Sequence, residues 1–360
     1  MNRIHRSNLP FAASFSIVLL FVSVQVAAQQ DNRSPKHDRE ETSAQATLWS
    51  DPTDLESRNL FYGAGGKQDA PRGAVFTYEQ EDLKGTSAKF DVRDQDGLKW
   101  RVKLGEEARP ETVATRLLWA VGYFTDKDYF LAKIQVTQMQ PVSKKRRKRV
   151  RGLLEPDGTM LNVRLKRRAK DEKKMGTWRW RQNPFSGTRE LNGLRVMMAL
   201  INNWDLKDQN NSIYARKTDG AGEDPCGSDP AHVMYMVSDI GASFGTAGRV
   251  RDRARAKGNL ESYQRSKFIR NIGADYVDFN VPARESWVLT VNPKEYIRRL
   301  HLRWIGQRIP RADAKWMGQL LARLSHEQIS DAFRAADYPP DQVDGFSKVV
   351  EERIAKLNDL

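Results

Sequence analysis

The spacing of hydrophobic residues near the beginning of the chain predicts a small antiparallel sheet. Apolar residues recur at strand-like intervals in three short segments that turn-forming residues separate, at 74–78, 88–92 and 100–104. In the third segment the large apolar side chains fall at every second position, so Lys103 shares the opposite face with Arg101. The pattern therefore places a lysine on the polar face of a strand.

A helix and a further strand are predicted after this sheet. Residues 111–122 carry apolar side chains at helical spacing, with Glu111 at the beginning and a glycine at the end. Residues 129–136 return to a strand pattern. The segment Asn-Pro-Phe-Ser-Gly at 183–187 then breaks the chain like a hinge.

Helical spacing dominates the second half of the chain. Residues 190–204 form one amphipathic segment, and most of the chain from residue 294 onward is helical. Two short strands, at 212–215 and 233–237, flank a loop rich in Gly, Asp and Pro. This order of elements predicts an α+β fold with a sheet-rich first part and a mainly helical second part.

The first 28 residues have the composition of a secretory signal peptide. Arg3 and Arg6 precede a short apolar run, and Val26-Ala27-Ala28 resembles a cleavage site. An uncleaved anchor is the alternative, although the apolar run is short for a membrane span. Export to the periplasm or outside the cell is expected. The polar residues 29–58 then predict a flexible linker.

Charge and cysteine content narrow the class of protein further. The single cysteine, Cys226, excludes an intrachain disulfide and a bacterial lipoprotein. The formal net charge is +14, and basic residues gather at 142–175, which predicts a basic hairpin. Such a cluster attracts an anionic surface or polyanion, or is simply solvated. No motif of a dedicated nucleic-acid-binding domain is present.

The strongest chemical signal lies between residues 203 and 245. Asp205 begins the sequence Asp-Leu-Lys-Asp-Gln-Asn, which includes Lys207 and ends at Asn210. Asp239 begins Asp-Ile-Gly directly after the second short strand. Carboxylate and amide oxygens are the ligands that Mg²⁺ prefers. Asn211 is a rival for the position of Asn210, and only spacing favours Asn210.

Other chemistries have less support in the sequence. The five histidines are scattered and lack the spacing of a metal site, and no Gly-x-Ser-x-Gly motif surrounds a serine. The turn Gly85-Thr86-Ser87 joins the first two strands and has one glycine, so an ordinary hairpin turn is the alternative to an anion-binding loop.

With these motifs in order, the chain resembles the protein-kinase-like superfamily. The similarity is to its atypical branches, namely the secretory-pathway Golgi kinases and the HipA-type bacterial kinases, and more distantly the phosphoinositide kinases. The run from Gly85 to Phe90 resembles the Gly-Thr-x-x-Lys segment that secretory kinases place over the nucleotide. The run from Asp239 to Gly245 resembles their Asp-x-Gly-x-x-Phe-Gly segment. The resemblance covers roughly residues 72–290.

The resemblance implies ATP as phosphoryl donor and Mg²⁺ as cofactor. It implies that Asp205 orients the acceptor hydroxyl, that Lys207 reaches the transferred phosphoryl group, and that Asn210 and Asp239 hold the metal. The nucleotide-binding residues that it implies are Lys103, its ion-pair partner Glu111, and Gly85, Thr86, Ser87 and Lys89.

The resemblance also implies a two-lobed fold. The boundaries expected from it are an N-lobe at 59–188, with the basic hairpin as an insertion, and a C-lobe at 189–360. The chain lacks the His-Arg pair before Asp205, an Ala-Pro-Glu segment and a triple-glycine loop. These departures leave the acceptor open among protein, lipid head group, sugar and small molecule. The alternative function is a catalytically degenerate module that binds a nucleotide or polyanion.

Overall fold

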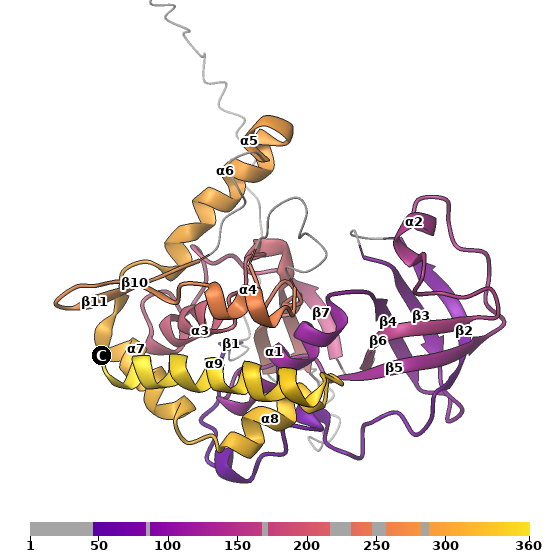
Figure 1. Cartoon of the computed structure of the whole chain (residues 1–360), viewed down its shortest axis with the longest axis horizontal. Coiled ribbons are helices and arrows are strands. Elements are labelled where there is room, and N and C mark those ends of the chain that lie inside the picture. Colours follow the sequence, from indigo (N-terminus) through magenta and orange to yellow (C-terminus); the bar gives the residue numbers. More distant parts are fainter. Residues whose placement is uncertain (1–45, 84–86, 168–171, 217–231, 247–256, 282–287) are drawn as a thin grey trace, which may run out of the picture. The chain divides into compact units, whose positions relative to one another are not determined.

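The computed structural model describes residues 46–83, 87–167, 172–216, 232–246, 257–281 and 288–360 (Figure 1). All of them belong to one packed unit. The described strands are β1 (Ala46–Thr47), β2 (Val75–Asp82), β3 (Lys89–Arg93), β4 (Lys99–Leu104), β5 (Asp128–Thr137), β6 (Thr159–Arg167), β7 (Glu172–Gly176), β8 (Asn211–Arg216), β9 (His232–Val237), β10 (Ile269–Ile272), β11 (Tyr276–Phe279) and β12 (Ile309–Pro310).

The described α-helices are concentrated in the second half of the chain. They are α1 (Ala108–Ala120), α2 (Arg147–Val150), α3 (Arg189–Leu200), α4 (Leu260–Arg265), α5 (Val288–Val291), α6 (Pro293–His301), α7 (Arg311–Leu321), α8 (His326–Arg334) and α9 (Pro340–Asn358). This mixture of sheets and helices confirms the α+β class. Within the described part of the chain, no helix combines the length and apolar character needed to cross a membrane.

The strands that precede and follow α1 close a small barrel. Their order around it is β2, β3, β4, β6 and β5, with β2 and β5 parallel and the other neighbours antiparallel. Alternation sends Phe90, Trp100 and Val102 into an apolar interior. The strands expected at 74–105 and 129–136 are β2 to β5, so these predictions are confirmed.

Helix α1 is buried on nearly all sides. It lies against β5 and β6 of the barrel and against α8. Its apolar residues Val113 and Leu117 belong to the large core shared with the helices, while Glu111 is also buried. Because a buried carboxylate is stable only when it is paired, a cation is expected in contact with Glu111.

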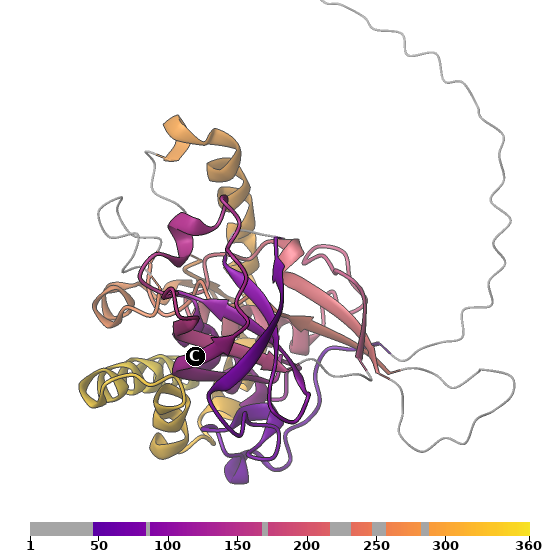
Figure 2. The ribbon, with the colours of Figure 1, turned by 90° about the vertical axis from the view of Figure 1, so that its right-hand side faces the viewer.

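The mainly helical part is organised around α9. Helices α7 and α8 both pack against α9, and Figure 2 shows the yellow ribbons of the C-terminal helices gathered on one side of the molecule. Helix α3 packs against α7. Phe333 and Phe346 stack with ring centroids 5.0 Å apart. A second sheet, in the order β1, β9, β8 and β7, supports the loops that follow α3 and β9. This sheet includes the two short strands predicted at 212–215 and 233–237.

The linker predicted at 29–58 is wrong for its described residues, which begin at residue 46. Strand β1 pairs in parallel with β9, and Leu48 and Leu55 are buried in the large core. The Gln328 side chain donates hydrogen bonds to the carbonyl oxygens of Leu55 and Arg58 at 2.9 and 3.0 Å. A few apolar residues are enough to dock this polar segment. Residues 29–45 lie outside the described part.

Of the basic hairpin expected at 142–175, the described residues show one short antiparallel bridge, between Leu154 and Met160, and the flanking strands belong to two different sheets. Strand β6 pairs with both β4 and β5 as a member of the barrel, and β7 pairs with β8 in the other sheet. The first basic cluster instead surrounds α2, between β5 and β6. The alternation of apolar residues could not distinguish a separate basic hairpin from a strand of the barrel, because β6 also carries cations.

One residue of the basic cluster, Arg146, is buried and forms part of the folded structure. The Arg146 side chain is 1% exposed, and its guanidinium donates to the carbonyl oxygens of Ser87 at 2.7 Å and Asp82 at 3.4 Å. These two residues flank Gly85 and Thr86, which lie outside the described residues. Arg146 therefore ties α2 to both ends of the turn that was expected to cover a nucleotide.

Replacing Arg146 with methionine should lower the free energy of unfolding by about 2 kcal/mol, because buried carbonyl groups would lose a charged donor. Replacing its exposed neighbour Arg147 with methionine should change the same quantity by less than about 0.5 kcal/mol. Urea denaturation of both variants measures this difference. Equal effects would show that the hydrogen bonds of the buried Arg146 side chain do not stabilise the fold.

Candidate functional site

A buried lysine forms the centre of the candidate site. Lys103 of β4 is 0% exposed and meets three carboxylates. Its Nζ lies 2.7 Å from Glu107 Oε2, 2.8 Å from Glu111 Oε2 and 2.9 Å from Asp239 Oδ1. Burial alone would lower the pKa of Lys103, but Asp239, Glu107 and Glu111 together hold the pKa well above its usual value. The lysine therefore stays charged.

The two glutamates come from different turns at the beginning of α1. Burial raises the pKa of Glu111 against the opposing effects of Arg164 and Lys103, and Arg164 Nη2 lies 3.3 Å from Glu111 Oε1. Glu107 immediately precedes α1 and also meets Lys257 Nζ at 2.5 Å. Burial opposes ionisation of Glu107, but Lys103 and Lys257 lower its pKa far below the usual value.

A glycine allows α1 to approach the end of β9. A Cβ added to Gly241 would lie 2.7 Å from Glu107 Cβ and 3.0 Å from the Glu107 carbonyl oxygen. Any side chain there would push the beginning of α1 away from Asp239. A glycine after Asp239 also suits a sharp turn, but the structure shows that Gly241 permits this close contact.

Asp239 is positioned by the neighbouring loop as well as by Lys103. The backbone N–H groups of Ser238 and Asp239 donate to the Asn210 carbonyl oxygen at 2.8 and 3.3 Å. The Lys103 ammonium lowers the pKa of Asp239, so the carboxylate is ionised at neutral pH. The Asp239 side chain remains 40% exposed. It combines a fixed position with access for a ligand.

A second group of charges surrounds Asp205. Its Oδ1 lies 2.5 Å from Arg299 Nη1 and 3.3 Å from Lys207 Nζ. The side-chain amide of Asn210 donates to the Asp205 carbonyl oxygen at 2.5 Å. The rival Asn211 is fully buried and instead donates to the Trp178 carbonyl oxygen at 3.1 Å. Asn210, rather than Asn211, thus connects Asp205 with Asp239.

The structure describes Ser87 and Lys89 of the turn that was expected to cover the nucleotide. Gly85 and Thr86 lie outside the described residues. The Ser87 hydroxyl donates to Glu107 Oε2 at 3.2 Å, which attaches the end of the turn to the charged cluster. Burial, followed by repulsion from Lys103, lowers the pKa of Lys89 on β3. The fold therefore holds a second cation close to the first one at a cost in stability.

Replacing Lys89 with methionine should raise the thermal unfolding midpoint at pH 7 by a few degrees, because Lys89 is charged there and its lowered pKa means that folding disfavours the charged form. In the wild-type protein, stability should increase as the pH rises through the folded-state pKa of Lys89 toward its higher unfolded value. Lys133→Met, at an exposed position on β5, is the control and should leave the midpoint unchanged. A lower midpoint for Lys89→Met would contradict this interpretation.

Sequence reasoning missed four charged residues of the site. Lys257 had no motif, and Arg164 was one of many cations on β6. Arg299 of α6 is far from Asp205 in the sequence, yet it is 4% exposed and donates to the Trp204 carbonyl oxygen at 2.7 Å. Only Glu107 carried a signal, because it follows Lys103 by four residues and immediately precedes α1.

A cavity that does not include the charged site around Lys103, Asp205 and Asp239 lies elsewhere in the described part of the chain. Its volume is about 780 Å³, and its lining includes residues 122–127 and the methionines of β9, but not Lys103, Asp205 or Asp239. Its charges are largely matched, since Asp69 pairs with Lys127 at 3.0 Å and Asp126 pairs with Lys166 at 2.6 Å. Cavity volume and the clustering of charged residues therefore point to two different candidate sites.

Comparisons with known proteins assign no family to the chain. No protein-family model and no curated protein matches the sequence. Among solved structures, the chain is similar to a Helicobacter pylori proinflammatory kinase, CtkA. The TM-score is 0.40 at 10% sequence identity, and the match covers 79% of this chain and 95% of that chain. Likeness of this degree does not establish a shared fold.

Proposed function

We propose that the protein is an exported kinase-like phosphotransferase. It moves the γ-phosphoryl group of ATP to a hydroxyl group of a protein, a lipid head group or a small molecule. The observation that supports this most directly is the contact set of Lys103, which joins Glu111 of α1 to Asp239 after β9. A fixed ammonium beside a partly exposed carboxylate could bind the phosphates and the metal ion of a nucleoside triphosphate.

The residues present suit a magnesium ion. Asp239 supplies a carboxylate and Asn210 supplies an amide oxygen, and their backbones are hydrogen-bonded to each other. Among the described residues, no group of three or more His, Cys, Asp or Glu side chains forms a metal site. Asp239 and Asn210 would therefore hold the ion together with phosphate oxygens, and the ion would neutralise phosphate charge.

In the proposed reaction, Asp205 receives the proton of the acceptor hydroxyl. The acceptor oxygen forms a bond to the γ-phosphorus as the bond to the β–γ bridging oxygen breaks, and ADP leaves with that oxygen. Lys207 and Lys103 offset the negative charge of the phosphoryl groups. Ser87 and Lys89 border the nucleotide on the barrel side. Arg299 holds the Asp205 carboxylate in one orientation.

One observation favours the alternative of a binding module. Asp205 Oδ1 already contacts Arg299 Nη1 at 2.5 Å and Lys207 Nζ at 3.3 Å, so two cations occupy the oxygen that an acceptor hydroxyl would approach. A nucleotide could then bind at Lys103 and Asp239 without transfer of its phosphoryl group. The difference between the two proposals is therefore turnover, and not nucleotide affinity.

Incubation of the purified protein with radiolabelled ATP separates these proposals. A phosphotransferase should release ADP in a magnesium-dependent way, and Asp205→Asn should abolish that release while retaining ATP binding. Magnesium-dependent binding without ADP release would support the binding module. Absence of both binding and release would reject both proposals.

Export gives a separate prediction. If residues 1–28 are a cleaved signal peptide, the protein from its native cell should begin at or near Gln29. Mass spectrometry of the intact protein measures this directly. A soluble cytoplasmic protein that retains Met1 to Ala28 would reject export, and a membrane-bound protein that retains them would indicate an anchor.

A further inference from the structure

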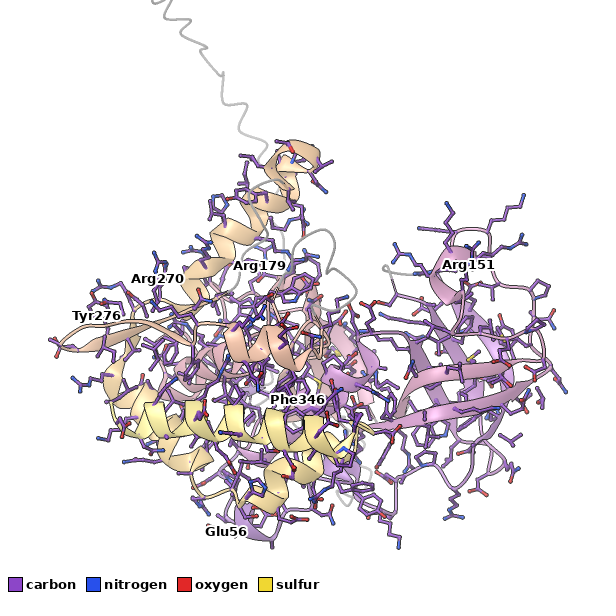
Figure 3. The ribbon with its side chains drawn as sticks, viewed as in Figure 1. Glu56, Arg151, Arg179, Arg270, Tyr276 and Phe346 are labelled. Atoms are coloured by element: carbon purple, nitrogen blue, oxygen red, sulfur yellow. The ribbon has the colours of Figure 1, made fainter. Side chains whose placement is uncertain are left out.

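A second, strongly basic cavity lies beside the beginning of α1. Its volume is about 470 Å³. Its lining comes from the beginning of α1 and the residues before it, from α2 and the segment after it, from β6, from the segment before α4 and from the residues around α9. The charged side chains in this lining are Arg109, Arg149, Arg151, Lys257 and Glu106. Four cations thus face one carboxylate. Figure 3 labels Arg151 on the segment that follows α2.

The cations come from segments that the fold brings together. Arg109 lies in the first turn of α1, two residues before Glu111, while Lys257 lies close to Arg109 only through the loop after β9. Part of their charge is already balanced. Lys257 meets Glu107 at 2.5 Å, and Arg109 Nη2 lies 3.5 Å from Asp337 Oδ2, whose side chain is 63% exposed. Arg149 and Arg151 contribute two further cations to the lining.

Two polar atoms of the lining are buried and have no hydrogen-bond partner among the residues that the structure describes. They are Nε of Arg109 and the hydroxyl oxygen of Tyr338, a residue that is only 6% exposed. The Arg109 guanidinium is also held between two rings, 5.4 Å from the centroid of Phe130 and 5.5 Å from that of Tyr338. An unpaired buried donor costs about 1–3 kcal/mol, so both donors favour an acceptor in this cavity.

The donors determine the chemistry of the ligand. Burial raises the pKa of Tyr338, so its hydroxyl stays protonated and can donate. Guanidinium groups bind the oxygens of phosphate in bidentate geometry, and several cations can share one dianion. We propose that this cavity binds a phosphoryl group, either as free phosphate or as the phosphate of a phosphorylated side chain. The polyanion expected at the basic cluster is thereby assigned to a defined site.

Isothermal titration of the purified protein with inorganic phosphate tests the proposal without any nucleotide. Arg151→Gln should weaken phosphate binding about tenfold, which corresponds to 1.4 kcal/mol. Lys148→Gln makes the same charge change on exposed α2, outside the cavity lining, and should weaken binding less than about twofold. Tyr338→Phe should also weaken binding, and it should raise the unfolding midpoint of the ligand-free protein, because it removes a buried hydroxyl that has no partner among the described residues.

Two further arms identify the source of the phosphoryl group. A phosphoserine peptide that binds more tightly than inorganic phosphate, while its unphosphorylated form does not bind, would assign the site to phosphorylated side chains. Tighter binding of inorganic phosphate would assign it to the free anion. No phosphate or phosphopeptide binding at millimolar concentration, or equal losses in Arg151→Gln and Lys148→Gln, would overturn the proposal. Neither result depends on kinase activity.

Discussion

Replacing Lys103 with methionine should lower the free energy of unfolding at pH 7 by about 3–5 kcal/mol, the usual cost of removing one partner from a buried ion pair. The substitution removes the cation that lies within 2.9 Å of Glu107, Glu111 and Asp239. Arg164 would continue to compensate Glu111, and Lys257 would continue to compensate Glu107. The three carboxylates would still repel one another. Chemical denaturation measures the resulting change in the free energy of unfolding.

The pH dependence of this loss distinguishes charge from packing. In the wild-type protein Lys103 lowers the pKa values of Glu107 and Asp239, so the stability from this contact is present above their unfolded values and is lost as the pH falls through the folded values. Without Lys103 the same carboxyl groups should take up protons more readily. The difference from wild type should therefore become smaller between about pH 7 and pH 5.

Two variants serve as controls for the Lys103 prediction. Lys99→Met lies on the same strand, with a side chain that is 57% exposed, and should change the free energy of unfolding by less than about 0.5 kcal/mol. Adding Glu111→Gln to Lys103→Met should recover part of the loss, because one buried negative charge disappears. A loss that is independent of pH and of Glu111 would indicate a packing defect instead of uncompensated charge.

Sequence patterns were informative where local spacing controls the outcome. The alternation in 100–104 correctly placed Lys103 on a strand, and helical spacing placed Glu111 at the beginning of α1. The burial of Lys103 was not predictable, since an exposed lysine gives the same alternation. It results from the packing of α1 against the barrel, a contact between separate elements.

Long-range pairing explains most of what the sequence did not reveal. Arg299 contacts Asp205 only because the fold returns α6 to the loop after α3. The barrel position of β6 depends on its pairing with β4 and β5, and its cations resembled those around α2. Arg146 is one of six consecutive basic residues, and nothing in that run distinguishes the buried one. Such features arise from tertiary contacts and leave no local signature.

Replacing Asp239 with asparagine should remove the magnesium dependence of ATP binding. The neutral amide keeps the shape of the side chain but cannot balance a divalent ion, so the affinity gained on adding Mg²⁺ should fall at least about a hundredfold. ADP release should fall about a thousandfold. Folding should survive, because the side chain is 40% exposed and Lys103 keeps Glu107 and Glu111, which limits the loss of stability to about 1 kcal/mol.

The sign of the change in metal-free ATP affinity makes this prediction specific. Asp239 is a negative charge beside the lysine expected to meet the phosphates, so Asp239→Asn should leave metal-free ATP affinity equal to wild type or higher. Calorimetry with and without Mg²⁺ measures both quantities, and Asp344→Asn, an exposed change on α9, should alter neither. A site that merely attracts polyanions would gain affinity under both conditions, because the variant is more positive. Only a site in which Asp239 holds the metal should lose affinity with Mg²⁺ and retain or gain it without.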